Sequence, residues 1–234
     1  MKAVILAAGK GTRLRPLTDE RPKPLVEVDG RTLLEHVFLF LPDAITELIV
    51  VIGYKGAMIR EKFGSRWNGR NITYVSQEEQ KGTGHALFMC RDHLKGAGRF
   101  LVCYADDLHH KESVEKCLNH DNAILAFHSP DPKKFGVIEH SDMRVRSIVE
   151  KPEVPTSNFV AIGVYVLAET ILDYYAKVVF AEGREHYLTD MLNEFVKDNF
   201  VVAVPTEFWH PIATVSDVDA FEAQKCFESE RNLA

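Results

Sequence analysis

The sequence predicts an α/β fold: a Rossmann-like, mostly parallel (mixed) sheet flanked by helices on both faces, with a smaller antiparallel subregion. Two observations lead to this prediction. Short apolar runs alternate with helical patterns through the first 130 residues, and after that point three apolar runs follow one another with little helix between them. Alternating strands and helices build parallel sheets, whereas strands joined by short connections pair antiparallel.

The first part contains five predicted strands and four predicted helices. The first strand is an apolar run that ends at glycine, and the first helix begins with a capping box formed by Thr32 and Glu35. Another helix stops at Gly64. The strands are predicted at 2–7, 47–52, 72–76, 99–104 and 123–127, and the helices after Thr32 and at 55–63, 85–94 and 114–118.

The second part is richer in strands. Strands are predicted at 135–139, 145–150, 159–167 and 201–204, and helices at 169–175, at 187–197 and from Val215 onward. No linker, repeat or low-complexity stretch interrupts the chain. The sequence therefore predicts a single domain over residues 1–234.

Composition excludes several classes of partner. The net charge is −6 and the chain has no Lys/Arg run, which argues against nucleic acid. No segment is long enough to span a bilayer, and the apolar run at 3–8 is too short for a signal peptide. The four cysteines form no C-x-x-C pair and are expected to be reduced and buried. We therefore expect a cytoplasmic protein without a membrane partner.

The first strand leads into a loop with the composition of an anion site. Small residues and two glycines, in the order Leu6, Ala7, Ala8, Gly9, Lys10, Gly11, Thr12, Arg13, allow backbone N–H groups to approach phosphate oxygens. The P-loop is excluded because no lysine followed by Ser or Thr stands at the required spacing. The dinucleotide fingerprint is excluded because Leu14 takes the place of its third glycine. Two cations, Arg13 and Lys23, flank this loop. Prolines on both sides of Lys23 hold its backbone in place.

The string L-A-A-G-x-G-T-R-L followed by P-K-P-L resembles the signature of the sugar-1-phosphate nucleotidyltransferases, whose superfamily includes cytidylyltransferases acting on phosphoalcohols. The resemblance implies an NTP and a phosphorylated small-molecule acceptor as partners. It also implies roles for two cations: Arg13 would contact the departing pyrophosphate, and Lys23 the α-phosphate or the acceptor phosphate. The loop would hold the triphosphate through Leu6, Ala7, Ala8, Gly9, Gly11, Thr12 and Arg13.

A second segment resembles the part of this family that recognises the base. It reads Q-E-E-Q-K-G-T-G-H-A, and the resemblance adds Gln77, Gly82 and Thr83 to the nucleotide-binding residues. A glutamine amide can both donate to and accept from a pyrimidine edge, so UTP or dTTP is favoured. CTP with a phosphoalcohol or phosphonate acceptor remains the alternative.

The resemblance also implies a magnesium cofactor. Asp106 follows an apolar strand where the family has a Mg²⁺ ligand, and hard cations prefer carboxylate oxygen. Asp107 is expected to face solvent or to lie behind the ligand shell, and His109 and His110 are expected at the surface.

The acceptor residues follow from later motifs. The elements F-G-V-I, V-E-K-P and Y-L-T-D resemble the family's sugar pocket and point to Gly136, Glu150, Lys151 and Thr189. Ala161 stands where the family commonly has an asparagine on the sugar, so that contact is missing. Residues 1–130 would then bind the nucleotide, and 131–234 the acceptor together with a C-terminal helix.

The second metal carboxylate of the family is missing. Depending on the alignment, its place is taken by Pro211 or Ala213, and the second ligand stays undecided, with His210 and Asp217 as substitutes. The gap leaves open a catalytically impaired, nucleotide-binding regulatory protein as a further alternative. The sequence is also compatible with a homo-oligomer.

Overall fold

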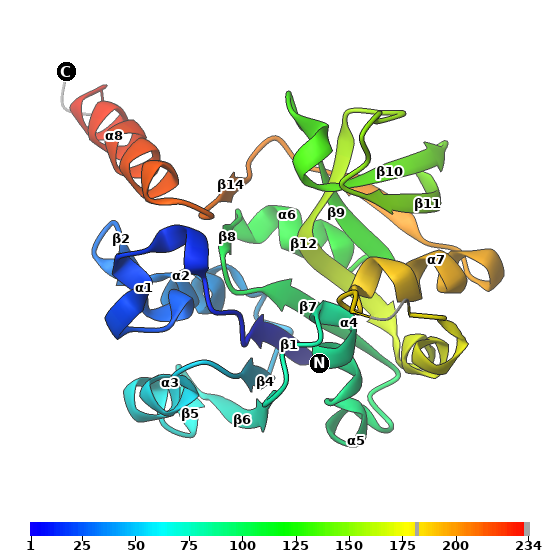
Figure 1. Cartoon of the computed structure of the whole chain (residues 1–234), viewed down its shortest axis with the longest axis horizontal. Coiled ribbons are helices and arrows are strands. Elements are labelled where there is room, and N and C mark those ends of the chain that lie inside the picture. The colour runs from blue at the N-terminus through cyan, green and yellow to red at the C-terminus, as the bar shows by residue number, and fades with distance from the viewer. Residues whose placement is uncertain (181–182, 232–234) are drawn as a thin grey trace.

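The structure is a computed structural model that describes residues 1–180 and 183–231, with side chains described up to residue 223. A ten-stranded mixed sheet forms its centre (Figure 1), in the order β10-β11-β13-β9-β12-β7-β1-β4-β6-β5. These strands are β1 (Lys2–Ala7), β4 (Glu47–Ile52), β5 (Arg66–Trp67), β6 (Arg70–Ser76), β7 (Arg99–Tyr104), β9 (Ala123–His128), β10 (Gly136–Ser141), β11 (Arg144–Glu150), β12 (Phe159–Ala168) and β13 (Val202–Pro205). Two small sheets pair β2 (Glu27–Val28) with β3 (Arg31–Thr32) and β8 (Asp107–Leu108) with β14 (His210–Pro211).

The helices lie on both faces of this sheet, as predicted. They are α1 (Leu17–Glu20), α2 (Leu33–Phe40), α3 (Gly56–Phe63), α4 (Thr83–Phe88), α5 (Arg91–Leu94), α6 (Lys111–Cys117), α7 (Leu188–Asp198) and α8 (Val215–Arg231), with 3₁₀ turns η1 (Thr12–Leu14), η2 (Lys23–Leu25), η3 (Pro132–Lys134) and η4 (Glu169–Lys177). Helices α2, α3 and α6 pack with Ile5 of β1, whereas α4 and α7 pack with Val4 on the opposite face. The alternation of β1 side chains thus supplies both cores.

Within the predicted nucleotide-binding part, strands β7, β1, β4 and β6 are parallel, and the short strand β5 pairs antiparallel with β6 at the sheet edge. Strand β1 pairs in parallel with β4 and β7, and β4 pairs in parallel with β6. Strand β12 then runs antiparallel between β7 and β9, and β10 forms antiparallel pairs with β11 and β12. Figure 1 shows β10 and β11 as a hairpin to one side of the body. The predicted antiparallel subregion is confirmed.

One predicted helix was wrong as a single element. Residues 85–94 form two helices, α4 and α5, with a break at Met89 and Cys90. Leu87, Cys90 and Leu94 are all buried in the same core. Because the apolar spacing continues across the break, the sequence pattern gave no sign of it.

Three cysteines, Cys90, Cys103 and Cys117, are free thiols in the core. Burial raises the pKa of the Cys90 and Cys117 thiols to about 12, so both stay protonated at neutral pH. The prediction for Cys226 falls outside the side chains that the structure describes. Across the described residues, no helix is both long and apolar enough to cross a membrane.

The capping box predicted at the start of α2 is present. Glu35 N donates to Thr32 Oγ1 at 3.3 Å, and Thr32 N donates to Glu35 Oε2 at 2.7 Å. Replacing Thr32 by alanine removes the acceptor for one otherwise unpaired N–H at the helix start. We therefore expect the Thr32→Ala variant to lose about 1 kcal/mol of unfolding free energy, measured by urea denaturation. Thr46→Ala, at an exposed position outside any helix, is the control and should stay within about 0.5 kcal/mol of the original chain.

Candidate active site

A cavity of about 920 Å³ opens at the carboxyl ends of the parallel strands β1 and β7. Open α/β sheets bind ligands at this edge. Most of the predicted site residues line the cavity: Leu6, Ala7, Ala8, Gly9, Arg13, Lys23, Gln77, Gly82, Thr83, Asp106, Gly136, Glu150, Lys151, Ala161 and Thr189. The fold therefore brings the two predicted halves of the site, 1–130 and 131–234, to one cavity.

Gly11 and Thr12, predicted to bind the nucleotide, are not among the residues that line the cavity. Gly11 instead shapes the loop. Its φ is +64°, and a Cβ built on it would lie 2.7 Å from Lys23 Cβ. The Thr18 hydroxyl also donates to the Gly11 carbonyl at 2.9 Å. Only glycine allows the phosphate loop to pack this closely on the segment that carries Lys23.

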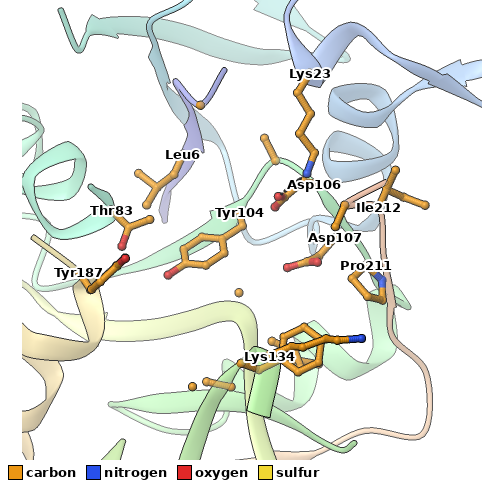
Figure 2. A pocket seen from close by; sticks show the side chains of 18 of the residues that line it. Leu6, Lys23, Thr83, Tyr104, Asp106, Asp107, Lys134, Tyr187, Pro211 and Ile212 are labelled. Atoms are coloured by element: carbon orange, nitrogen blue, oxygen red, sulfur yellow. Dashed lines mark hydrogen bonds and ion pairs between the residues drawn. The ribbon is translucent and has the colours of Figure 1, made fainter. Parts of the chain in front are cut away.

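Lys23 and Asp106 form the central ion pair of the cavity. Lys23 Nζ lies 2.7 Å from Asp106 Oδ2, and the Lys23 side chain is nearly buried. Figure 2 shows the Lys23 side chain extending into the cavity as far as the carboxylate. Arg13 lies in the same cavity but is exposed. No hydrogen bond or ion pair joins its guanidinium to the residues that the structure describes. Arg13 is thus a cation available to a ligand.

We call residues 77–86, which were predicted to recognise the base, the base segment. The Gln77 side chain holds this segment in place. Gln77 is buried, and its Nε2 donates to the Gly82 carbonyl at 3.1 Å and lies 3.0 Å from His85 Nδ1. Burial lowers the pKa of His85, so its ring is neutral and Nδ1 can accept this hydrogen bond. Both amide hydrogens of Gln77 are therefore used within the protein. Its Oε1 accepts no hydrogen bond from the described residues, which leaves an acceptor for a base.

The base segment is joined to a segment 105 residues further along the chain. His186 N donates to Lys81 O at 2.6 Å, Gly84 N donates to His186 O at 2.7 Å, and Leu188 N donates to Thr83 Oγ1 at 2.9 Å. The Thr83 hydroxyl thus satisfies a free N–H at the start of α7. This contact fixes the predicted nucleotide segment directly against the predicted acceptor segment.

The predicted acceptor residues converge at the hairpin. Gly136 lies opposite Glu150 in one ladder and opposite Ala161 in the other. A Cβ on Gly136 would come within 3.3 Å of Glu150 Oε2 and 3.5 Å of Thr189 Cγ2. Burial raises the pKa of Glu150, against the effect of Lys151, whose Nζ lies 3.7 Å from its Oε1. These residues form the polar part of the cavity on the side of the predicted acceptor segment.

Asp107 does not face solvent, which was one of its two predicted positions. It lines the cavity, its side chain is buried, and Figure 2 shows its carboxylate pointing into the open space with Pro211 beside it. Burial, with a further contribution from the Asp106 charge, raises the pKa of Asp107 well above its usual range. The Trp209 indole lies near enough to lower that pKa, yet its N–H makes no hydrogen bond of normal geometry.

His109 also differs from its predicted surface position. It is buried against Phe40, with ring centroids 5.2 Å apart, while His110 is exposed and stacks on Phe208. Burial lowers the pKa of His109 to about 3, so it is neutral. The two rings point to different surroundings and do not form a metal pair.

The segment 209–217, in which the family's second metal carboxylate is missing, lies against Asp106 and Asp107. Pro211 pairs with Asp107 in the β8–β14 ladder, and Ile212 N donates to Asp106 O at 2.9 Å. The two substitutes make contacts within the protein, and Asp217 also lines the cavity. Asp217 accepts from Ala213 N at 2.9 Å and Thr214 N at 2.7 Å at the start of α8, and His210 Nε2 contacts the Asp217 carbonyl at 3.0 Å. His210 and Asp217 therefore have structural roles.

Several cavity residues carry no recognisable motif and were missed. Phe127, Ser129 and Lys134 line the acceptor side. Trp209, the first residue of the segment in which the family's second metal carboxylate was sought, also lines the cavity, and its ring packs edge-on against Phe135 with ring centroids 4.7 Å apart. Gly163, with φ +75°, was also missed; a Cβ on it would lie 2.6 Å from Asp107 Oδ2. A glycine that directly follows an apolar pair gives no sign of such a contact in the sequence.

Comparisons with known proteins agree with this geometry. Residues 2–225 match the family model described as nucleotidyl transferase. The chain is 33% identical over 222 residues to the bifunctional protein GlmU of Methanococcus maripaludis, covering 93% of this chain and 53% of that protein. It is 35% identical over 245 residues to the UTP–glucose-1-phosphate uridylyltransferase AglF of Haloferax volcanii, covering 100% and 99% of the two chains. The chain therefore spans about half the length of the GlmU relative and nearly all of AglF.

Solved structures have the same fold. One is a Bacillus anthracis protein described as a glucose-1-phosphate thymidylyltransferase, in complex with sucrose. It has a TM-score of 0.86 and 26% identity, with 96% of this chain and 94% of that chain covered. A UDP-glucose pyrophosphorylase complexed with UDP-glucose has a TM-score of 0.82 at 22% identity, over 97% and 98% of the two chains, and supports the fold alone.

Proposed function

Because the chain belongs to the nucleotidyl transferase family, we propose that it transfers a nucleoside monophosphate from UTP or dTTP to a sugar-1-phosphate and releases pyrophosphate. The observation that carries the proposal is the single cavity in which the phosphate loop, the Gln77 segment and the Glu150 pocket surround the Lys23–Asp106 pair. In this proposal residues 1–130 bind the nucleotide, and 131–234 bind the acceptor. A cytoplasmic location is part of it, since free buried thiols are typical of a reducing compartment.

The residues support a direct phosphoryl reaction. An acceptor phosphate is ionised at neutral pH and needs no general base, so positioning and charge neutralisation can carry the catalysis. Lys23 would steady the reacting phosphates, Arg13 would offset the charge that builds on pyrophosphate, and the backbone N–H groups of the loop would add to it. Gln77 would accept from the base through its free Oε1.

Magnesium is the proposed cofactor, and the residues fit it. The Asp106 carboxylate lies in the cavity that the phosphate loop lines, and carboxylate oxygen is a ligand that Mg²⁺ prefers. The described residues contain no cluster of three or more His, Cys, Asp or Glu side chains suited to a metal. Such a sparse donor set suits Mg²⁺, which commonly takes one or two carboxylates and completes its shell with phosphates and water. A bound Mg²⁺ would neutralise phosphate charge and polarise the α-phosphate.

The proposed acceptor is a sugar-1-phosphate without an N-acetyl group. Ala161 has no polar side-chain atom in the pocket to contact such a group. The AglF relative, whose name gives UTP and glucose-1-phosphate as its substrates, matches this chain along nearly its whole length.

The test is pyrophosphate release with each of UTP, dTTP, CTP, GTP and ATP against a panel of sugar-1-phosphates and phosphoalcohols, with and without Mg²⁺. We expect release with UTP or dTTP and a hexose-1-phosphate, and loss of release with EDTA. Release with CTP and a phosphoalcohol alone would replace this proposal with the cytidylyltransferase. Nucleotide binding without release in any combination would instead favour a regulatory protein.

A further inference from the structure

The Asp106–Asp107 turn contains a buried carboxylate that the proposed reaction has not used. Asp107 is only 8% exposed, and its side chain points into the cavity (Figure 2). The Trp209 N–H lies near it but makes no hydrogen bond of normal geometry, and no other described residue donates one to it. Buried carboxylates are ordinarily paired or hydrogen-bonded, because leaving one unpaired is costly. The Asp107 carboxylate is therefore available to bind an ion or ligand that enters the cavity.

The backbone leaves room for this carboxylate. Gly163 has φ +75°, and any Cβ there would overlap Asp107 Oδ2 at 2.6 Å. On its other side, Asp107 pairs with Pro211 across the short β8–β14 ladder, and proline offers no side-chain donor. Gly163 and Pro211 thus leave room for the Asp107 carboxylate in the same cavity as Asp106.

The other donors nearby are already engaged. Asp217 accepts hydrogen bonds from Ala213 and Thr214, and His210 contacts the Asp217 carbonyl. Lys23 is a single ammonium whose ion pair is with Asp106, so it does not neutralise both carboxylates. Two adjacent carboxylates that line a phosphate site, with one cation paired to the first of them, form a site suited to a divalent ion.

We propose that Asp107 is the second carboxylate that holds the divalent cation, in place of any side chain from the segment 209–217. This inference rests on the proposed function. It assigns to this chain a two-aspartate site made by consecutive residues, completed by phosphate oxygens and water.

The test is a titration with Mn²⁺, followed by electron paramagnetic resonance, with and without a non-hydrolysable UTP analogue. We expect Asp107→Asn to weaken Mn²⁺ binding in the presence of the analogue at least tenfold. Affinity for the analogue in EDTA should change less than twofold, because Asp107 contacts the metal and not the nucleotide. Asp121→Asn, at an exposed position outside the cavity, is the control and should bind Mn²⁺ like the original chain.

A relocation variant makes the test sharper. Pro211 lies opposite Asp107, so D107N/P211D returns a carboxylate to the same site from the neighbouring strand. We expect it to recover Mn²⁺ affinity to within about threefold of the original chain. Unfolding midpoints confirm that each variant is folded. If Asp107→Asn does not fold, Asp107→Glu replaces it, and a shift of at least threefold in Mn²⁺ affinity is expected from the displaced carboxylate.

The outcomes separate the two proposals. Unchanged Mn²⁺ affinity in folded Asp107→Asn, or in Asp107→Glu where that variant replaces it, would overturn the role of Asp107 and leave the transferase proposal standing. A double variant that folds but stays as weak as Asp107→Asn would also count against it. If the original chain binds no Mn²⁺ with the analogue present, the magnesium-dependent function itself is wrong.

Discussion

Replacing Arg13 by alanine is expected to lower kcat by about 10²-fold or more, with little change in stability. Arg13 lines the cavity at the phosphate loop, and no described residue pairs with its guanidinium. A free cation at this position can act on the charge that develops on the leaving pyrophosphate. Removing one donor that acts mainly in the transition state costs about 10²–10³-fold in other enzymes. Steady-state kinetics with the identified substrates give kcat and KM separately.

Arg15→Ala is the matched control. Arg15 lies on the same loop and is also exposed, but it pairs with Asp19 at 3.1 Å and does not line the cavity. An exposed ion pair of this kind contributes little, so kcat should stay within about twofold. Near-normal turnover in Arg13→Ala, or an equal loss in both variants, would exclude a specific role for Arg13 at the pyrophosphate.

The strands were predictable because their signal is local. The bounds of β1, β4 and β7 agree with the apolar runs, since each strand is buried on both faces and reads as a continuous hydrophobic segment. The capping box of α2 was likewise visible within four residues. The break between α4 and α5 was not visible, because both helices present their apolar residues to one core.

The site was predictable where a motif carries the residue, and the contacts between motifs were not. Lys23 and Asp106 were both singled out, but nothing in the sequence pairs residues 83 positions apart. One predicted position for Asp107 was toward solvent, and neighbours on an extended strand would point to opposite faces. The chain instead turns at Ala105 and Asp106, so both carboxylates face the cavity.

Glycines give the clearest example of this limit. Gly82 was identified through its motif as part of a base-binding segment. The structure adds a reason that depends on the fold: a Cβ at Gly82 would lie 2.6 Å from His186 O and 2.8 Å from His186 N. The backbone of residue 186 therefore occupies the space that any other residue at position 82 would need.

Replacing Gly82 by alanine is accordingly expected to lower both stability and activity. Gly82 has φ 99° and ψ 177°, a conformation that is essentially restricted to glycine and costs about 1–3 kcal/mol for another residue. Overlap with the His186 backbone adds about 1–3 kcal/mol, or forces the two segments apart. Separation would break the hydrogen bonds from His186 N to Lys81 O and from Leu188 N to Thr83 Oγ1. Since a shift of about 1 Å can cost about 10²-fold, kcat/KM should fall by about that factor.

Gly64→Ala separates the backbone strain from the overlap. Gly64 also has a positive φ with an extended ψ, at 60° and −145°, but no atom lies within 4 Å of a Cβ built there. It follows α3, away from the cavity, and should lose about 1–3 kcal/mol of unfolding free energy while the folded enzyme keeps its kcat/KM. Urea denaturation and steady-state kinetics on both variants give the comparison. If Gly82→Ala kept its kcat/KM while losing no more stability than Gly64→Ala, the contact between the base segment and residue 186 would have no part in forming the site.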